Sequence, residues 1–135
     1  MADVVTTQVI NNGPRNLIIK RTNVSDGTGE SGVTFVDATS TTYANEGQVP
    51  GIHLKVVRIV YDVYAGYVRL QWAASSAVDM TMLAGFGEQN YRPFAGLPNP
   101  NPTGATGSIL LTTENFALNS AYSITIYMTK NVPTV

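Results

Sequence analysis

The clearest structural pattern in the chain is IHLKVVRIVYDVYAGYVRLQWA, residues 52–73. Apolar and polar residues alternate on both sides of Ala65-Gly66, which is typical of β-strands that bury one face. A two-residue turn at Ala65-Gly66 would pair the two runs as a β-hairpin, although a turn of three to five residues also fits. The two-residue turn places Tyr64 opposite Tyr67, as an exposed pair available for contacts.

This register gives the expected hairpin two consistent faces. The residues of one face are all apolar: Ile59, Tyr61, Val63, Val68, Leu70 and Trp72. The other face pairs Asp62 with Arg69, a cross-strand contact worth about 0.2–1 kcal/mol. A shift of one residue would turn both charges into the core, so the pattern favours this pairing.

Short extended segments separated by turn residues make up the rest of the chain. Val78–Leu83 fits a strand or a single helical turn, and Asn23–Gly32 and Ala38–Gly51 fit loops. Further strands are expected at Arg15–Thr22, Val33–Asp37, Ser108–Thr113 and Ala121–Lys130. About seven or eight short strands without an amphipathic helix predict an all-β fold, an antiparallel β-sandwich that is jelly-roll-like.

The N-terminal residues 1–13 are expected to form an extended arm, followed by a single β-sandwich domain over 14–135. The chain has 135 residues, which fits one domain of roughly 100–150 residues. The arm ends at the breaker Asn11-Asn12-Gly13-Pro14 and has no charged side chain after Asp3. It suits strand addition to a neighbouring subunit, with an edge strand or a disordered terminus as alternatives.

A second candidate contact segment is Phe94–Gly107, where prolines and glycines predict a long exposed loop. Together with the arm and the tyrosine pair it completes the expected partner-binding set. The candidate partner-binding residues are Val4, Val5, Gln8, Val9, Ile10, Tyr64, Tyr67, Phe94 and Leu97.

The surface is expected to be unusually poor in charge. Charged residues make up 13% of the chain, against about 25% in typical domains, and neutral polar surfaces suit contacts with other proteins. The net charge of −1 argues against nucleic acid as a partner. The sequence has no apolar run of roughly 18–20 residues for a membrane span, and its first residues do not resemble a secretory signal.

Catalytic and metal-binding patterns are not found in the sequence. There is no Cys, which excludes thiol chemistry and zinc–cysteine sites, and His53 is the single His. The acidic residues are scattered, and Asp26–Glu30 reads as a glycine-rich turn instead of a calcium loop. We therefore expect a protein that is not an enzyme and has no catalytic residue, cofactor or metal.

Four segments carry a resemblance to a known family: Gly13–Lys20, Asn23–Ser31, Val36-Asp37, and Ile52–Tyr64 with the Trp-containing strand after it. They resemble the small capsid decoration (cement) proteins of tailed bacteriophages. The resemblance implies a β-sandwich, often a jelly roll, that forms a homotrimer and binds the major capsid protein. It also implies a location on the outside of the virion after synthesis in the host cytoplasm, and no enzymatic activity.

The alternative function is a carbohydrate- or receptor-binding β-sandwich module of a phage fibre or surface protein. Exposed Tyr64, Tyr67 and Tyr91 would then form an aromatic platform for a ligand. A coat protein that packages its own genome is less favoured, because the first basic side chain of the chain is Arg15.

Overall fold

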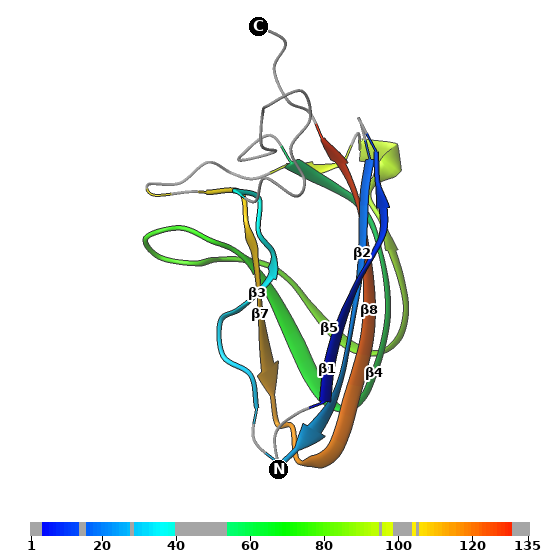
Figure 1. Cartoon of the computed structure of the whole chain (residues 1–135), viewed down its shortest axis with the longest axis vertical. Coiled ribbons are helices and arrows are strands. Elements are labelled where there is room, and N and C mark those ends of the chain that lie inside the picture. The colour runs from blue at the N-terminus through cyan, green and yellow to red at the C-terminus, as the bar shows by residue number, and fades with distance from the viewer. Residues whose placement is uncertain are drawn as a thin grey trace, which may run out of the picture.

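The computed structural model of the chain describes residues 4–13, 16–27, 29–39, 54–94, 96–98, 104 and 106–130. These residues form eight β-strands and one short 3₁₀ turn, η3 (Arg92–Phe94), with no α-helix among them. The strands are β1 (Val4–Asn12), β2 (Asn16–Asp26), β3 (Val33–Val36), β4 (Leu54–Trp72), β5 (Val78–Asn90), β6 (Leu97–Pro98), β7 (Ile109–Glu114) and β8 (Leu118–Lys130). The predicted all-β class is therefore confirmed (Figure 1).

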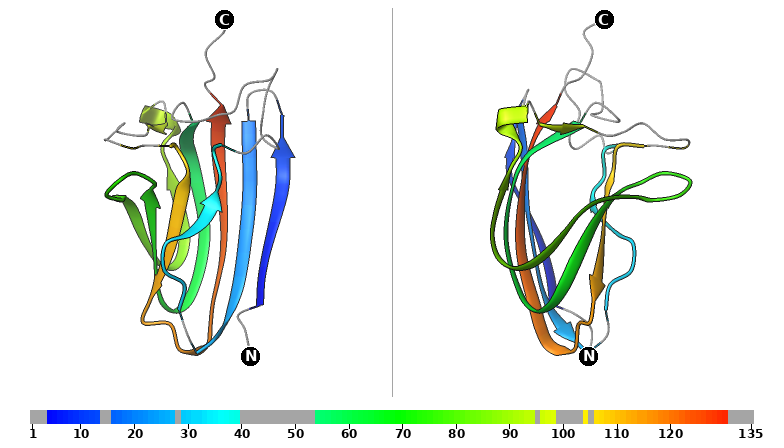
Figure 2. Two further views of the ribbon diagram at one scale, coloured as in Figure 1. Left: turned by 60° about the vertical axis from the view of Figure 1, so that its left-hand side comes forward. Right: turned by 180° about the vertical axis from the view of Figure 1, so that it is seen from behind.

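All pairings are antiparallel, and they join the strands into one sheet with the order β1-β2-β8-β4-β7-β3. The first half of β4 pairs with β8 and its second half with β7, while β5 follows the opposite edge of both halves. The sheet therefore curls into a half-barrel (Figure 2). One wall contains β1, β2, β8 and the first half of β4, and the other contains β3, β7 and the second half.

The predicted hairpin at Ala65-Gly66 is wrong. The chain bends there and continues as β4, so that Asp62 lies beside Ser123 and Phe86 instead of Arg69. Ala65 adopts a positive φ of 61°, and Gly66 passes so close to the ring of Phe116 that a Cβ would collide with it. The long antiparallel partner of β4 is β5, which shows that Val78–Leu83 belongs to a strand that continues to Asn90.

The predicted apolar face of residues 59–72 is nevertheless confirmed. Five of its six members are buried on the inner face of the curled sheet, and Tyr61 packs against them half-buried. The inward positions are odd-numbered before the bend and even-numbered after it, because the register shifts between Val63 and Val68. This shift of one position keeps the same apolar set on the core side in both halves of the strand. The inward set of β8, Tyr122, Ile124, Ile126 and Met128, is buried as predicted.

Several strand boundaries differ from the sequence-based expectation, and β8 begins at Leu118, three residues before the expected Ala121. β2 continues to Asp26, four residues further than the expected end at Thr22, because Asn23 and Val24 pair with β8. The expected arm forms β1, which pairs with β2 from Val4 to Asn12 as the edge strand of the sheet. Residues 40–53, which include His53 and most of the expected loop Ala38–Gly51, lie outside the described residues.

Candidate functional site

The predicted contact residues of the N-terminal segment lie on the sheet edge formed by β1. Val5, Gln8, Val9 and Ile10 are exposed there, and Ile10 sits at a β-bulge. Val4 is also in the strand, although its side chain lies outside the described part of the structure. Val5 and Val9 pair with inward-facing residues of β2, so their side chains lie on the inner face of the sheet. At this edge no described segment covers them, and both remain exposed.

The free edge of β1 is chemically unusual. Among the described strands β1 pairs with β2 alone, and none of its nine residues is charged. Natural proteins commonly protect such edges with charged residues, proline or bulges, because unpaired backbone groups recruit other strands. Within β1 itself the only such feature is the bulge at Ile10, which lies near one end. The first six residues of β1, Val4–Val9, therefore offer a regular edge to a partner.

The two tyrosines of the expected pair do not face each other. Tyr64 and Tyr67 are both exposed, but they lie on opposite sides of the bend in β4. Tyr64 lines a shallow depression of about 220 Å³ on the outer face, together with Asp62 and Val24. Tyr91, the third tyrosine of the alternative platform, packs half-buried against the core and donates its hydroxyl to Gln89 Oε1 at 2.6 Å. The structure therefore does not gather these three rings into one platform.

Half of the expected loop Phe94–Gly107 lies outside the described residues, which include only 94, 96–98, 104 and 106–107 of it. Leu97 belongs to β6, pairs with Val56 and packs half-buried against the core, so it offers only part of its side chain to a partner. Phe94 ends η3, and its side chain lies outside the described part. Phe86 is a contact candidate that the sequence analysis missed: it is 84% exposed on β5. The sequence signal that could have identified Phe86 as exposed was its position between Gly85 and Gly87, in a segment with weak alternation.

A polar cluster on the inner face, which we call the inner cluster, joins Arg21, Asn23, Glu30 and Tyr122. Glu30 Oε2 accepts a bond from Arg21 Nη2 at 2.6 Å. Its Oε1 accepts from Asn23 Nδ2 at 2.8 Å and from the Tyr122 hydroxyl at 2.6 Å. The Tyr122 oxygen in turn accepts from Arg21 Nε at 2.8 Å. The cluster therefore forms a closed ring of charge-assisted hydrogen bonds.

The electrostatics of the inner cluster favour a structural role. The side chains of Arg21 and Glu30 are only 11% and 9% exposed. Burial of the hydroxyl and its bond to Glu30 raise the pKa of Tyr122 far above its ordinary value. Burial opposes the charge of Arg21, but its bonds with Tyr122 and Glu30 outweigh this and raise its pKa. Because both oxygens of Glu30 are occupied, the carboxylate is poorly placed to act as a base on a substrate.

The described residues contain no group of three acidic or histidine side chains placed to hold a metal ion. They also contain no helix long and apolar enough to cross a membrane. Comparisons with protein-family models, with curated proteins and with solved structures find no match to this chain.

Proposed function

We propose that this chain is a non-enzymatic structural protein that decorates the outer surface of a phage capsid and stabilises the shell. The observation that carries the proposal is the exposed, uncharged edge of β1. Such an edge can add to a strand of another protein, because main-chain hydrogen bonds give affinity and alternate side chains give specificity. The partner is the major capsid protein, consistent with the family resemblance of the sequence.

The inner face at β1 adds an apolar component to this edge. Val5 and Val9 are about two-fifths exposed, and a partner strand would extend the sheet and cover them. Covering apolar surface yields roughly 25 cal/mol per Å², and no charge on β1 has to lose its hydration. Binding only to the assembled lattice then stabilises that lattice by mass action, by about 2.7 kcal/mol at a ligand concentration of 100 Kd.

The finer parts of the proposal rest on the family resemblance. They are a jelly-roll-like sandwich, a homotrimeric assembly and a location on the virion exterior after synthesis in the host cytoplasm. Within the described sheet, β1 is an edge strand, and it would act as the docking segment without leaving β2. The alternative of a glycan-binding module built on Tyr64, Tyr67 and Tyr91 is less favoured, because Tyr91 is tied to Gln89.

The test is co-sedimentation of purified protein with capsids that lack it. We expect the native chain to bind, and Val9→Lys to weaken binding by at least about tenfold, a change of 1.4 kcal/mol. The lysine places a hydrated charge on the docking edge while its methylene chain still covers Ile19. Val24→Lys is the matched control, because Val24 is equally exposed but lies on the outer face of β2.

The possible failures have different meanings. If the native chain does not bind capsids, the decoration function is wrong. If the native chain and Val9→Lys bind equally well, the function stands but β1 is not the docking segment. Equal weakening by Val9→Lys and Val24→Lys would indicate that general surface charge, and not the edge, controls binding.

A further inference from the structure

A second outer-face depression lies at the other end of the sheet from Tyr64, between β1, β2, β4, β8 and η3. Its volume is about 220 Å³, and its walls include Asn11, Asn16, Tyr127 and Arg92 above an apolar floor at Ile18. The register explains why these residues meet. Asn11 lies beside Ile18, and Ile18 lies beside Tyr127, in one row across three strands. Arg92 reaches the same place from η3, just after β5 ends.

The ring of Tyr127 is held in place by its neighbour on β4. The guanidinium carbon of Arg58 lies 5.1 Å from the centre of the ring, within the range of a cation–π contact. Arg58 is also paired with Glu88 across β4 and β5. The positive charge of Arg58 is thus already matched by a carboxylate, and its contact with the ring orients one wall of the depression.

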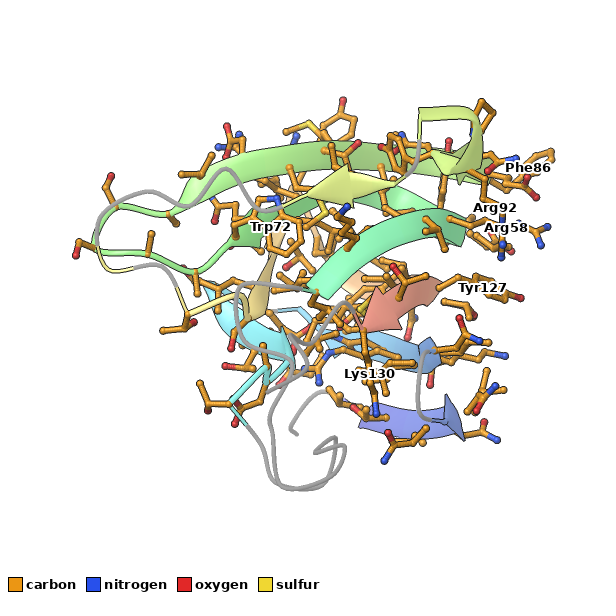
Figure 3. The ribbon with its side chains drawn as sticks, turned by 90° about the horizontal axis from the view of Figure 1, so that it is seen from above. Arg58, Trp72, Phe86, Arg92, Tyr127 and Lys130 are labelled. Atoms are coloured by element: carbon orange, nitrogen blue, oxygen red, sulfur yellow. The ribbon has the colours of Figure 1, made fainter. Side chains whose placement is uncertain are left out.

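Arg92 differs from Arg58 in its electrostatic surroundings. Within the described part of the chain, no carboxylate lies within ion-pair distance of its guanidinium. The backbone N–H of Arg92 donates to Asn90 Oδ1 at 3.0 Å. Figure 3 shows Arg92 beside Arg58 and Tyr127 on the same side of the sheet. The depression therefore presents one exposed cation that no described carboxylate neutralises.

We propose that this depression binds a single sugar ring that carries a carboxylate, such as a hexuronic acid. The Tyr127 ring and the aliphatic floor contact the apolar face of the sugar. The amides of Asn11 and Asn16 each offer both donors and an acceptor for hydroxyl groups. The guanidinium of Arg92 matches the carboxylate with two parallel N–H donors.

The size of the depression sets the scale of the ligand. Pockets for drug-sized ligands measure roughly 300–1,000 Å³, so a depression of about 220 Å³ suits one ring, with the rest of any chain left in solvent. A shallow site of this kind is expected to bind a monosaccharide with a Kd of about 1 mM. This site is independent of the docking edge, and it uses none of the tyrosines of the earlier platform.

The depression at Tyr64 provides an internal comparison. It has the same approximate volume and also an aromatic wall, but it contains the carboxylate of Asp62 and no cation. An acidic sugar would be repelled there and attracted at Arg92. A preference for the acidic sugar over the neutral sugar is therefore expected at the Arg92 depression and not at the Tyr64 depression.

The test is an NMR titration of the ¹⁵N-labelled chain at neutral pH with methyl glucuronide, whose carboxylate is free and ionised, and with methyl glucoside and acetate. We expect the acidic sugar to shift amide signals around Asn11, Asn16 and Tyr127, and to bind at least tenfold more tightly than the neutral sugar. Arg92→Gln should weaken acidic-sugar binding by at least tenfold. Lys20→Gln is the matched control, because Lys20 is a cation on the same outer face but outside the depression.

Four results would overturn the proposal. They are no shift at these amides with the acidic sugar, equal binding of the neutral sugar, equal binding of acetate, and equal weakening by Arg92→Gln and Lys20→Gln. Equal binding of acetate would reduce the site to a carboxylate contact without sugar recognition. Because Arg92 is exposed, its substitution should leave the fold intact, which the unperturbed signals of the core would verify.

Discussion

Two clusters of Arg, Glu and Tyr lie on opposite faces of the same curled sheet. The inner cluster uses Arg21, Glu30 and Tyr122, and the outer cluster consists of Arg58, Glu88 and Tyr127. Both tyrosines come from β8, where their odd spacing sends one side chain inward and the other outward. The same three residue types are therefore placed in two very different environments.

Burial decides what each cluster can do. The inner ion pair is about one-tenth exposed and ties the segment after β2 to both walls of the half-barrel. The outer pair is 36% and 41% exposed, and its tyrosine offers the ring instead of the hydroxyl. Exposed pairs contribute little to stability, whereas removing one member of a buried pair leaves an uncompensated charge. The inner cluster thus belongs to the fold, and the outer cluster shapes a surface.

The largest expected effect is that of Glu30→Ala. Removal of the carboxylate leaves the guanidinium of Arg21 buried without its counter-charge, which should lower the free energy of unfolding by about 3–5 kcal/mol. Urea denaturation measures this difference. The matched control is Glu88→Ala in the outer cluster, for which we expect almost no change. Similar losses for the two variants would contradict the distinction between the clusters.

The next largest effect is expected for Tyr122→Phe. This change removes the hydroxyl that accepts from Arg21 and donates to Glu30, at a cost of about 1–3 kcal/mol near neutral pH. Tyr127→Phe is the control, because the hydroxyl of Tyr127 takes no part in its contact with Arg58. A loss from Tyr127→Phe as large as that from Tyr122→Phe would show that hydroxyl burial is not the cause.

The contribution of the Tyr122 hydroxyl to the free energy of unfolding should also depend on pH. The pKa of Tyr122 is raised in the folded chain, so above the ordinary value of about 10 the native state keeps a proton that the unfolded chain releases. The unfolded state then binds fewer protons, and the free energy of unfolding falls as the pH rises. The stability gap between the native chain and Tyr122→Phe should therefore narrow above about pH 10. A constant gap in alkaline denaturation series would contradict this.

The two clusters also differ in how much of each could be predicted from the sequence. Alternation within each of the two runs of 59–72 assigned their six apolar residues to the core, and it did the same for the even residues of β8, because the two-residue period fixes the face of a side chain. The same rule places Arg21 inward after Leu17 and Ile19, which was a readable signal for a buried charge in need of a partner. The partner, Glu30, lies in a segment with no alternation, so no local pattern identifies it.

The hairpin error has a related physical cause. A local pattern specifies the face of a strand but not its neighbour, and Ala65-Gly66 fits a tight turn as well as a bend. The choice depends on β7 and β8, which pair with the two halves of β4 from far along the chain. The depression at Arg92 could not be predicted from a local pattern either, since its walls come from β1, β2, β4, β8 and η3.

A smaller effect is expected for Thr113→Val, which tests how the inner cluster is held by β7. The Thr113 hydroxyl oxygen accepts a bond from the backbone N–H of Glu30 at 2.8 Å and is buried. Valine keeps the shape but leaves that N–H without its acceptor, at a cost of about 1 kcal/mol. Thr112→Val is the control, because Thr112 accepts from Gly32 N at 2.9 Å in an exposed position where water can replace it. Equal costs for both variants would contradict the role of burial.

The smallest expected effect is that of Glu88→Gln in the outer cluster. The stability should stay within experimental error of the native chain, both at low salt and at about 1 M salt, where charges are screened beyond about 3 Å. A salt-dependent loss in the native chain that disappears in Glu88→Gln would show that the pair stabilises the fold after all. The same substitution removes a carboxylate from the neighbourhood of Arg58, beside Arg92 and Tyr127 (Figure 3). If the outer cluster serves a surface site, Glu88→Gln should bind the acidic sugar at least as tightly as the native chain does, with unchanged stability. Weaker binding by Glu88→Gln would mean that Glu88 is needed to orient the wall formed by Arg58 and Tyr127.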